Sequence, residues 1–300
     1  MGDPRYTVAI SNYNMARTLR ASLTSVLEQL DDRFEVIVID DGSDDGSAEI
    51  LRELEADYEL LRVVYDAGND NLGEARNHSF RVAEGEYVLS AVDTDDQFTR
   101  VIPEFVTLYE EIEADLDREF LLLAGGLYMA PRSLVRDVPY RSLGYGEDRD
   151  FYRRLLARDA LVSISHLPFR HSIGYDRPIP EKFRVGVETI VVQFRSGLAF
   201  RPYVEWAFAE LRSENGQLER HRALAHLVIA PFAYLLSFLG PRYEAPTEYR
   251  DIGRYKRALR DVHRTLTGLE TRFDVSVDRA KLGHRGRALF DIDERDEILD

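Results

Sequence analysis

Residues 87–96, Tyr-Val-Leu-Ser-Ala-Val-Asp-Thr-Asp-Asp, decide the fold that we expect for this chain. Their apolar run is typical of a strand that is buried on both faces of a parallel sheet. The run ends in the carboxylates of Asp93, Asp95 and Asp96. Ligands bind at the carboxyl edge of such sheets, and carboxylates this close repel each other unless a cation lies among them. We therefore predict a site for Mg²⁺ or Mn²⁺ and a diphosphate, with an acidic turn that caps a helix as the alternative.

Strands and helices alternate around this stretch. The β-rich runs cover residues 6–11, 34–40 and 61–65, and the helical patterns cover residues 16–30, 48–54, 72–83 and 103–117. Two later strands are expected over residues 120–130 and 161–167, the first with Gly125-Gly126, where a backbone must pass close to something. The alternation predicts an α/β fold with a mostly parallel sheet and right-handed crossovers.

The alternation of strands and helices stops near residue 178. Helical patterns then cover residues 181–195, 201–212, 217–239 and 248–269. We therefore expect an α/β domain over residues 1–177 and a helical C-terminal region over residues 178–300. Residues 223–239 are the most apolar stretch, slightly short for a membrane span and interrupted by Pro231. A buried core helix and a helix that lies in the plane of a membrane both fit this pattern.

The composition is acidic and poor in lysine. The net charge of -15 argues against nucleic acid as a partner. Lys182, Lys256 and Lys281 are the only lysines. Such a surface resembles that of proteins from extreme halophiles, although a GC-rich genome also favours arginine. Because there is no cysteine, disulfides and thiolate sites are excluded. No apolar signal segment opens the sequence, so we expect a cytoplasmic protein.

Four short motifs occur in a fixed order along the first third of the chain. They are Ser11-Asn12-Tyr13-Asn14, Asp40-Asp41-Gly42-Ser43, Asn71-Leu72-Gly73-Glu74-Ala75-Arg76-Asn77 and Asp93-Thr94-Asp95-Asp96. Their order and spacing resemble those of family 2 glycosyltransferases with the GT-A fold. The resemblance covers about residues 6–171. It implies a GT-A (Rossmann-like) mixed, mostly parallel sheet flanked by helices, and it leaves the C-terminal helical extension unassigned.

The resemblance implies how a nucleotide-sugar donor would bind. Ser11 and Asp40 match positions that hold the uracil of a UDP-sugar, and a carboxylate is a suitable acceptor for the base N3–H. Tyr13 would stack on the face of the base. Arg76 matches a residue near the base and the diphosphate, where a guanidinium suits both. For Asp40, helix capping is the alternative, and for Tyr13 it is ordinary packing.

The resemblance also implies the metal site. Asp93 matches a ribose contact, and Asp95 matches the carboxylate that binds Mg²⁺ or Mn²⁺. Asp96 would support the site, and Thr94 is the spacer that turns the flanking carboxylates toward one ligand. His171 matches a late histidine that completes the metal site.

Glu147-Asp148 resembles the acidic pair that holds the catalytic base of this family. Asp148 would be the base and Glu147 its neighbour, with two solvated acids as the alternative. The implied reaction is an inverting, metal-dependent transfer of a sugar from a nucleotide-sugar to a hydroxyl acceptor. Similar enzymes of haloarchaea extend dolichol-linked glycans. The acceptor would be a glycan or a lipid-linked glycan in protein N-glycosylation or surface polysaccharide assembly, at the cytoplasmic face of the membrane.

Three other functions stay open at this point. A polyprenyl-phosphate (dolichyl-phosphate) sugar synthase would use an acceptor that is already anionic and would need no base. A nucleotidyltransferase would normally place a Gly-rich loop and a lysine after the first strand, whereas this chain has Ser11-Asn12-Tyr13-Asn14 there and no lysine before Lys182. A non-catalytic sugar-nucleotide-binding protein would be expected to have lost one of the acidic motifs.

Overall fold

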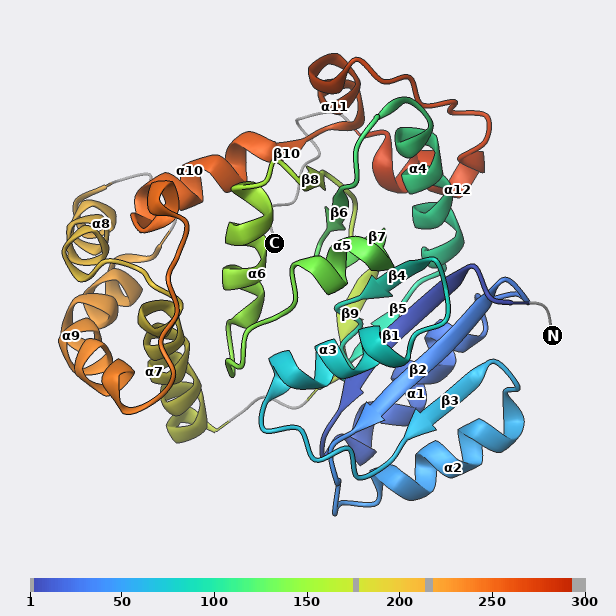
Figure 1. Ribbon diagram of the computed structural model, residues 1–300, viewed down its shortest axis with the longest axis horizontal. Coiled ribbons are helices and arrows are strands. Elements are labelled where there is room, and N and C mark those ends of the chain that lie inside the picture. Colours follow the sequence, from blue (N-terminus) through green and yellow to red (C-terminus); the bar gives the residue numbers. More distant parts are fainter. Residues whose placement is uncertain (1–2, 175–177, 214–217, 293–300) are drawn as a thin grey trace.

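An eight-stranded mixed sheet forms the centre of the computed structural model, which describes residues 3–174, 178–213 and 218–292 (Figure 1). The strand order is β10-β8-β6-β7-β4-β1-β2-β3, and β7 alone runs antiparallel to its neighbours β4 and β6. The strands are β1 (Tyr6–Asn12), β2 (Phe34–Asp40), β3 (Leu61–Val64), β4 (Tyr87–Ser90), β6 (Leu121–Ala124), β7 (Leu127–Pro131), β8 (Leu161–Ile164) and β10 (His263–Arg264). A separate two-stranded ribbon pairs β5 (Asp96–Phe98) with β9 (Arg170–Ser172).

Helices cover both faces of the sheet, because successive side chains of the central strands point to opposite faces and are apolar on both. In β2, Val36 and Val38 belong to one hydrophobic cluster, and Ile37 and Ile39 belong to the other. The first cluster takes α1 (Ala16–Leu27), α2 (Ser47–Asp57), α4 (Ile102–Asp115), α11 (Leu266–Phe273) and α12 (Gly283–Phe290). The second cluster takes α3 (Leu72–Val82), α5 (Arg132–Asp137), α6 (Glu147–Leu156) and α10 (Ile252–Val262).

Three further helices form a unit with a core of its own, drawn at the left of Figure 1. They are α7 (Ile179–Arg195), α8 (Phe200–Arg212) and α9 (Arg220–Leu236), followed by the short 3₁₀ turns η1 (Ser237–Leu239) and η2 (Thr247–Tyr249). Phe194 is fully buried between Tyr203 and Tyr234 at the centre of this unit. α7 contacts α6, so the helical unit lies directly against the α/β part of the chain.

The predicted mixed, mostly parallel sheet with flanking helices is confirmed, but its decisive strand ends earlier than expected. β4 stops at Ser90 because Ala91 adopts a left-handed conformation with φ of 62°. The carboxylates of Asp93 and Asp95 therefore lie in the turn that follows the strand. Asp96 already belongs to β5, where it pairs with Ser172 of β9.

Residues 120–130 form a hairpin and not the single strand that we predicted. Gly125 and Gly126 have φ values of 49° and 89°, which suits the two-residue turn between β6 and β7. The expected close approach is present as well. A Cβ atom on Gly126 would lie 3.1 Å from a guanidinium nitrogen of Arg170, which pairs with Asp96.

The predicted helix over residues 248–269 is divided in two. α10 ends at Val262, and the next two residues add β10 to the sheet beside β8. The ring of His263 hydrogen-bonds with the hydroxyl groups of Ser163 and Ser165, at 2.8 and 3.2 Å, and thereby fixes this pairing. Beyond Val262 the chain thus returns to the sheet. The region after the boundary predicted at residues 177/178 therefore contributes a strand to the α/β part as well as helices.

Two glycines provide a test of how tightly the sheet is packed. A Cβ atom on Gly85, just before β4, would lie 2.8 Å from the backbone of Tyr6 and Thr7 in β1. A Cβ atom added to Gly186, in the exposed middle of α7, would have no other atom within 4 Å. We expect Gly85→Ala to lower the free energy of unfolding by about 2 kcal/mol through overpacking. Gly186→Ala should raise it by about 0.5–1 kcal/mol through helix propensity.

Urea titrations of both variants and the parent chain, at one salt concentration, measure these free energies of unfolding. Equal effects of the two substitutions would contradict the close approach of the β1 and β4 ends.

Candidate active site

The helix α3 holds the segment that leads to the acidic pair. Asn77 donates a hydrogen bond to the carbonyl oxygen of Tyr140 and accepts one from its backbone N–H, each at 2.8 Å. Asn71 caps the start of α3 and donates to the hydroxyl of Ser142 at 2.7 Å. A Cβ atom on Gly73 would lie 2.3 Å from the carbonyl oxygen of Arg141, so only glycine allows this approach. Contact with residues 140–142 thus explains the spacing of Asn71, Gly73 and Asn77 along α3.

Arg76 connects α3 to the first turn of α6. Its Nε donates to Glu147 Oε1 at 3.1 Å, and its guanidinium lies 4.0 Å from the Asp93 carboxylate. The guanidinium also lies over the ring of Tyr140, 5.5 Å from its centre. These contacts bring together the turn after β4 and the predicted acidic pair, which lie more than fifty residues apart in the sequence.

A second arginine, Arg170 of β9, lies on the other side of the acidic turn. It donates to Asp96 Oδ2 at 2.6 Å and lies 4.0 Å from Asp93 Oδ2. Burial raises the pKa of Asp96, and Arg170 opposes that shift. Asp93 therefore lies between two guanidinium groups, with 54% of its side chain exposed to solvent. An arrangement of this kind can receive a phosphate group beside the arginines.

Asp95 is held through its backbone, which leaves its carboxylate at the partly exposed edge of the site. The Asp95 carbonyl oxygen accepts hydrogen bonds from the backbone N–H groups of Ile173 and Gly174, at 2.8 and 3.1 Å. A Cβ atom on Gly174 would lie 2.9 Å from the Asp95 carboxylate. Thr94 is buried between the two acids, as a spacer would be.

No group of three His, Cys, Asp or Glu side chains within the described residues is arranged to hold a metal ion alone. Strand alternation also separates His171 from the acidic turn. Arg170 reaches Asp96, so its neighbour His171 points to the opposite face of the β5–β9 ribbon, beside its register partner Gln97. His171 as a metal ligand remains a prediction, and this arrangement does not support it.

The two acids after β2 have different environments. Asp40 is only 1% exposed, and its oxygens accept hydrogen bonds from Asn12 at 2.7 Å and from the Ser43 hydroxyl at 2.6 Å. Asp41 is partly exposed and accepts from Asn69 at 2.6 Å, and partial burial raises its pKa. The predicted contact of Asp40 with a base is therefore not accessible in this arrangement, whereas Asp41 is partly exposed.

The other two predicted nucleoside contacts follow β1. Tyr13 exposes 60% of its surface, so its ring is free to stack on a planar ligand. Ser11 is partly exposed one residue before the end of β1, and it pairs with Ile39 of β2 in the sheet. Both residues lie at the same edge of the sheet as Asp41.

The members of the acidic pair differ in burial. Glu147 is 3% exposed and accepts hydrogen bonds from Arg76 and from the backbone N–H of Gly146. Burial raises the pKa of Glu147 to about 7, although Arg76 pulls in the other direction. Asp148 is partly exposed in the first turn of α6, where the helix dipole favours an anionic side chain. The geometry thus makes Asp148 the accessible acid and Glu147 the buried one.

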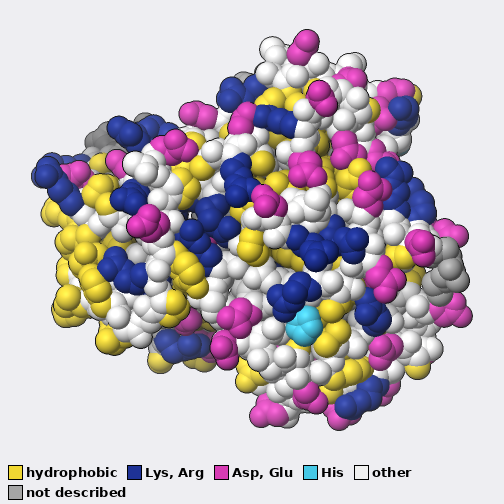
Figure 2. Space-filling view, viewed as in Figure 1, with side chains coloured by type: hydrophobic (Ala, Val, Ile, Leu, Met, Phe, Trp, Pro, Cys, Tyr) yellow, Lys and Arg dark blue, Asp and Glu magenta, His cyan; other side chains and the backbone are white. Residues whose placement is uncertain are grey.

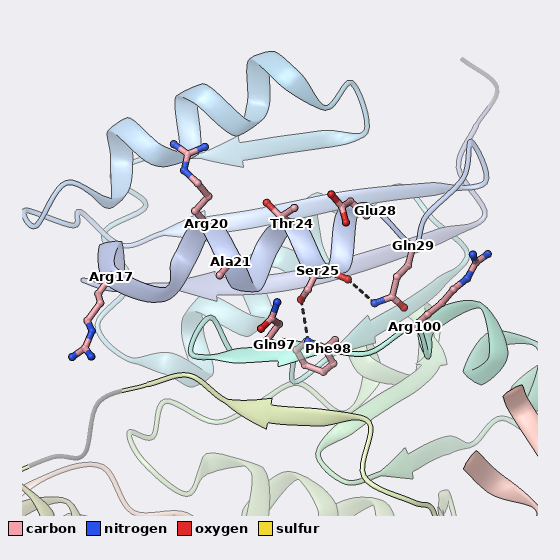
Figure 3. Close-up of a pocket in the computed structure, with 10 residues that line it drawn as sticks. All are labelled: Arg17, Arg20, Ala21, Thr24, Ser25, Glu28, Gln29, Gln97, Phe98 and Arg100. Carbon is pink, nitrogen blue, oxygen red and sulfur yellow. Dashed lines mark hydrogen bonds between the residues drawn. The ribbon is translucent and has the colours of Figure 1, made fainter. Parts of the chain in front are cut away.

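A separate surface groove lies between α1 and β5 and contains none of these residues (Figure 3). It has a volume of about 610 Å³ and is formed in part by Arg17, Arg20 and Arg100. Ser25 in its wall accepts a hydrogen bond from the backbone N–H of Phe98 at 3.0 Å. Because the acids that follow β4 and the two arginines beside them, Arg76 and Arg170, do not line this groove, we place the candidate site at the β4–β5 turn.

The motifs at the strand ends have counterparts in known proteins. Residues 7–117 match the family model of glycosyl transferase family 2. The chain is 37% identical over 93 residues to an uncharacterized glycosyltransferase of Nostoc sp., covering 31% of this chain and 28% of that protein. It is 36% identical over 111 residues to glycosyltransferase GlyA of Streptococcus pneumoniae, covering 37% of this chain and 15% of that protein. The match thus spans less than a third of either relative.

The fold has solved counterparts. The glucosyl-3-phosphoglycerate synthase of Mycobacterium tuberculosis, crystallised with Mn²⁺, UDP-glucose and phosphoglyceric acid, superposes with a TM-score of 0.52. The superposition covers 65% of this chain and 80% of that chain at 19% sequence identity. This likeness confirms the predicted GT-A architecture. The family resemblance is supported for residues 7–117, and the three proteins just named come from bacteria and not from haloarchaea.

Two residues of the site were not anticipated from the sequence. Arg170 stands next to His171, and a cationic side chain beside a predicted metal ligand is the signal that could have indicated it. Asp41 lies in the motif Asp40-Asp41-Gly42-Ser43, and the burial of Asp40 is what distinguishes the two acids.

The raised pKa of Glu147 makes the stability of the protein depend on pH. A carboxyl group whose pKa rises from 4.5 in the unfolded chain to about 7 binds more protons in the folded state. Its contribution to stability is therefore complete below pH 4.5 and is lost as the pH rises through 7. Relative to Glu147→Gln, the parent chain should lose about 2 kcal/mol of unfolding free energy between pH 5 and pH 8.

Urea titrations of both proteins across this pH range measure the difference. A difference that does not change with pH would mean that Arg76 keeps Glu147 ionised throughout.

Proposed function

We propose that this chain is an inverting glycosyltransferase that moves a sugar from a UDP-sugar to a hydroxyl acceptor. One observation supports this most strongly. The acidic pair at the start of α6 is held by Arg76 beside Asp93, in the turn where the sheet ends. A base for the acceptor and cationic groups for a diphosphate thus lie in one place.

The donor would bind across the ends of β1, β2 and β4. Tyr13 would stack on the uracil, and Asp41, rather than the buried Asp40, would accept a hydrogen bond from its N3–H. Ser11 would lie along the base edge. Asp93 would accept from the ribose hydroxyls. Arg76 would then face the diphosphate.

The residues after β4 fit a divalent cation that is shared with the donor. Mg²⁺ and Mn²⁺ in such sites commonly take one or two carboxylates and complete their shell with phosphates and water, which agrees with the absence of a three-ligand group in the described residues. Asp95 would hold the ion, and Asp96 would support the turn through Arg170. When bound, the ion would neutralise charge on the diphosphate.

Asp148 would act as the base. It would take the proton of the acceptor hydroxyl as that oxygen attacks the anomeric carbon on the face opposite UDP. The new carbon–oxygen bond forms while the bond from the anomeric carbon to the UDP oxygen breaks, and UDP leaves with the electron pair. Arg76 and Arg170, which each lie 4.0 Å from the Asp93 carboxylate, would stabilise the negative charge of the leaving group.

For the acceptor we propose a lipid-linked glycan that is extended at the cytoplasmic face of the membrane, in protein N-glycosylation or surface polysaccharide assembly. The acidic, lysine-poor composition supports work in high salt, as in a halophilic archaeon. A polyprenyl-phosphate sugar synthase is the second candidate, because the arginines beside Asp93 would also suit a phosphate acceptor. The acidic pair favours the hydroxyl acceptor.

The base assignment can be tested by UDP release. The chain is incubated with UDP-sugars and extracts of lipid-linked glycans in the presence of Mn²⁺, and UDP is measured. Asp148→Asn should reduce turnover by about 10²–10⁴-fold, because the acceptor proton then has no base. The matched control is Asp137→Asn. Asp137 is an exposed acid at the end of α5 that pairs with Arg158, so this variant should turn over at the normal rate.

The outcomes separate the two acceptor classes. Near-normal turnover of Asp148→Asn would remove Asp148 from the base role and favour the phosphate acceptor.

Chelation of divalent cations should stop UDP release in the parent chain, and added Mn²⁺ should restore it. Release that persists after chelation would contradict the proposed role of Asp95.

A further inference from the structure

The outward face of α9 and η1 is apolar to a degree that folding of this chain does not explain. Leu224, Val228, Phe232, Leu235 and Leu239 expose between 53% and 79% of their surface. They recur at intervals of three or four residues, which places them along one side of the helix. In Figure 2 hydrophobic side chains gather at the left edge of the molecule, where Figure 1 shows α8 and α9.

The inward face of α9 combines buried alanines with the partly buried side chains of Ile229 and Tyr234. The buried residues of this helix are Ala223, Ala230 and Ala233, which pack against α7 and α8. A core helix of a water-soluble domain buries most of its large side chains, whereas most of the large apolar side chains of α9 are exposed. Of the two alternatives left open by the sequence, the buried core helix is therefore wrong.

The charges around this face are distributed to suit an anionic surface. Residues 223–241 contain no Asp, Glu, Lys or Arg, and arginines stand at both ends, Arg222 and Arg242. Residues 178–262 hold 13 Lys and Arg against 10 Asp and Glu, whereas the rest of the chain holds 26 against 44. A region with a small basic excess, in a protein that is acidic as a whole, thus surrounds the most apolar stretch.

We propose that the outward face of α9 and η1 lies in the plane of an anionic lipid bilayer. The apolar side chains would enter the boundary between headgroups and acyl chains, and Arg222 and Arg242 would remain among the lipid phosphates. Arg242 already lies over the ring of Phe238, 4.1 Å from its centre, so its cationic group is beside the apolar face.

The bundle contacts make a lying helix fit better than a spanning one. α9 and η1 together are long and apolar enough to cross a bilayer, but α7 and α8 cover the inner side of α9. α8 displays the exposed ion pair Arg201–Glu205 in its first turns, and charged side chains are unfavourable in the hydrocarbon that would surround a spanning bundle. Burial lowers the pKa of His226 on α9 to about 4. This side chain, which hydrogen-bonds with the Tyr203 hydroxyl, is therefore neutral and adds no charge to α9.

This surface connects to the candidate active site through one helix. α7 packs against α9 on one side and against residues 144–146 on the other. A Cβ atom on Gly144 would lie 2.7 Å from the Glu188 carboxylate of α7, and one on Gly146 would lie 3.5 Å from Thr189. A bilayer under α9 would therefore hold the acidic pair at a set height above the membrane.

Sedimentation with lipid vesicles tests this surface without reference to the proposed reaction. The full chain is mixed with vesicles of phosphatidylglycerol and phosphatidylcholine, or of phosphatidylcholine alone. We expect binding to the anionic vesicles, and at least about tenfold weaker binding when Phe232→Ser and Leu235→Ser are combined. Because both side chains are exposed, the double variant should keep the thermal unfolding transition of the parent chain.

A matched pair of arginines tests the charge. Arg222 pairs with Glu219 three residues earlier at 3.3 Å, and Arg52 on α2 pairs with Glu49 in the same way at 3.4 Å. Arg222→Ala should weaken binding to anionic vesicles by about fivefold, and Arg52→Ala should leave it unchanged.

Three results would overturn the proposal. The first is a parent chain that stays in the supernatant with anionic vesicles. The second is a folded double variant that binds as well as the parent. The third is a parent dimer in light scattering that the double variant abolishes, which would assign this face to a second copy of the chain.

Discussion

The contact between Arg76 and Glu147 is the constraint on which the rest of the site depends. Arg76 is fixed by α3, and Glu147 begins α6, so their hydrogen bond sets the position of Asp148 relative to the acids after β4. A buried carboxylate without a partner would be costly, and a nearby guanidinium reduces that cost. The hydrogen bonds of Asn71 and Asn77 to residues 140–142 hold the intervening chain in place.

Local patterns were sufficient to predict the α/β architecture, because the periods of apolar residues report which faces are buried. The same patterns predicted where β1 and β2 end. They also predicted that the polar residues after these strands lie together at one edge of the sheet. Features that depend on distant contacts could not be predicted in this way. β10 forms where His263 meets Ser163 of β8 and Ser165 just after it, and these serines lie about a hundred positions from His263.

The candidate site shows the same division between local and distant information. The acids after β4 were found because they are close in sequence. The burial of Asp40 depends on Asn12 and Ser43, and the place of Arg170 depends on the pairing of β9 with β5. For α9 the sequence showed an apolar helix, and only packing revealed that its fully buried positions are alanines and that most of its large side chains are exposed.

A crystal structure of this chain with UDP and Mn²⁺ is the most direct test of the central claim, that the strand ends and α6 form one donor and acceptor site. We predict the uracil against Tyr13 and Asp41, and the diphosphate beside Asp95 and within reach of Arg76. UDP bound in the groove between α1 and β5, or a diphosphate that lies away from Arg76 and the acidic pair, would contradict this account.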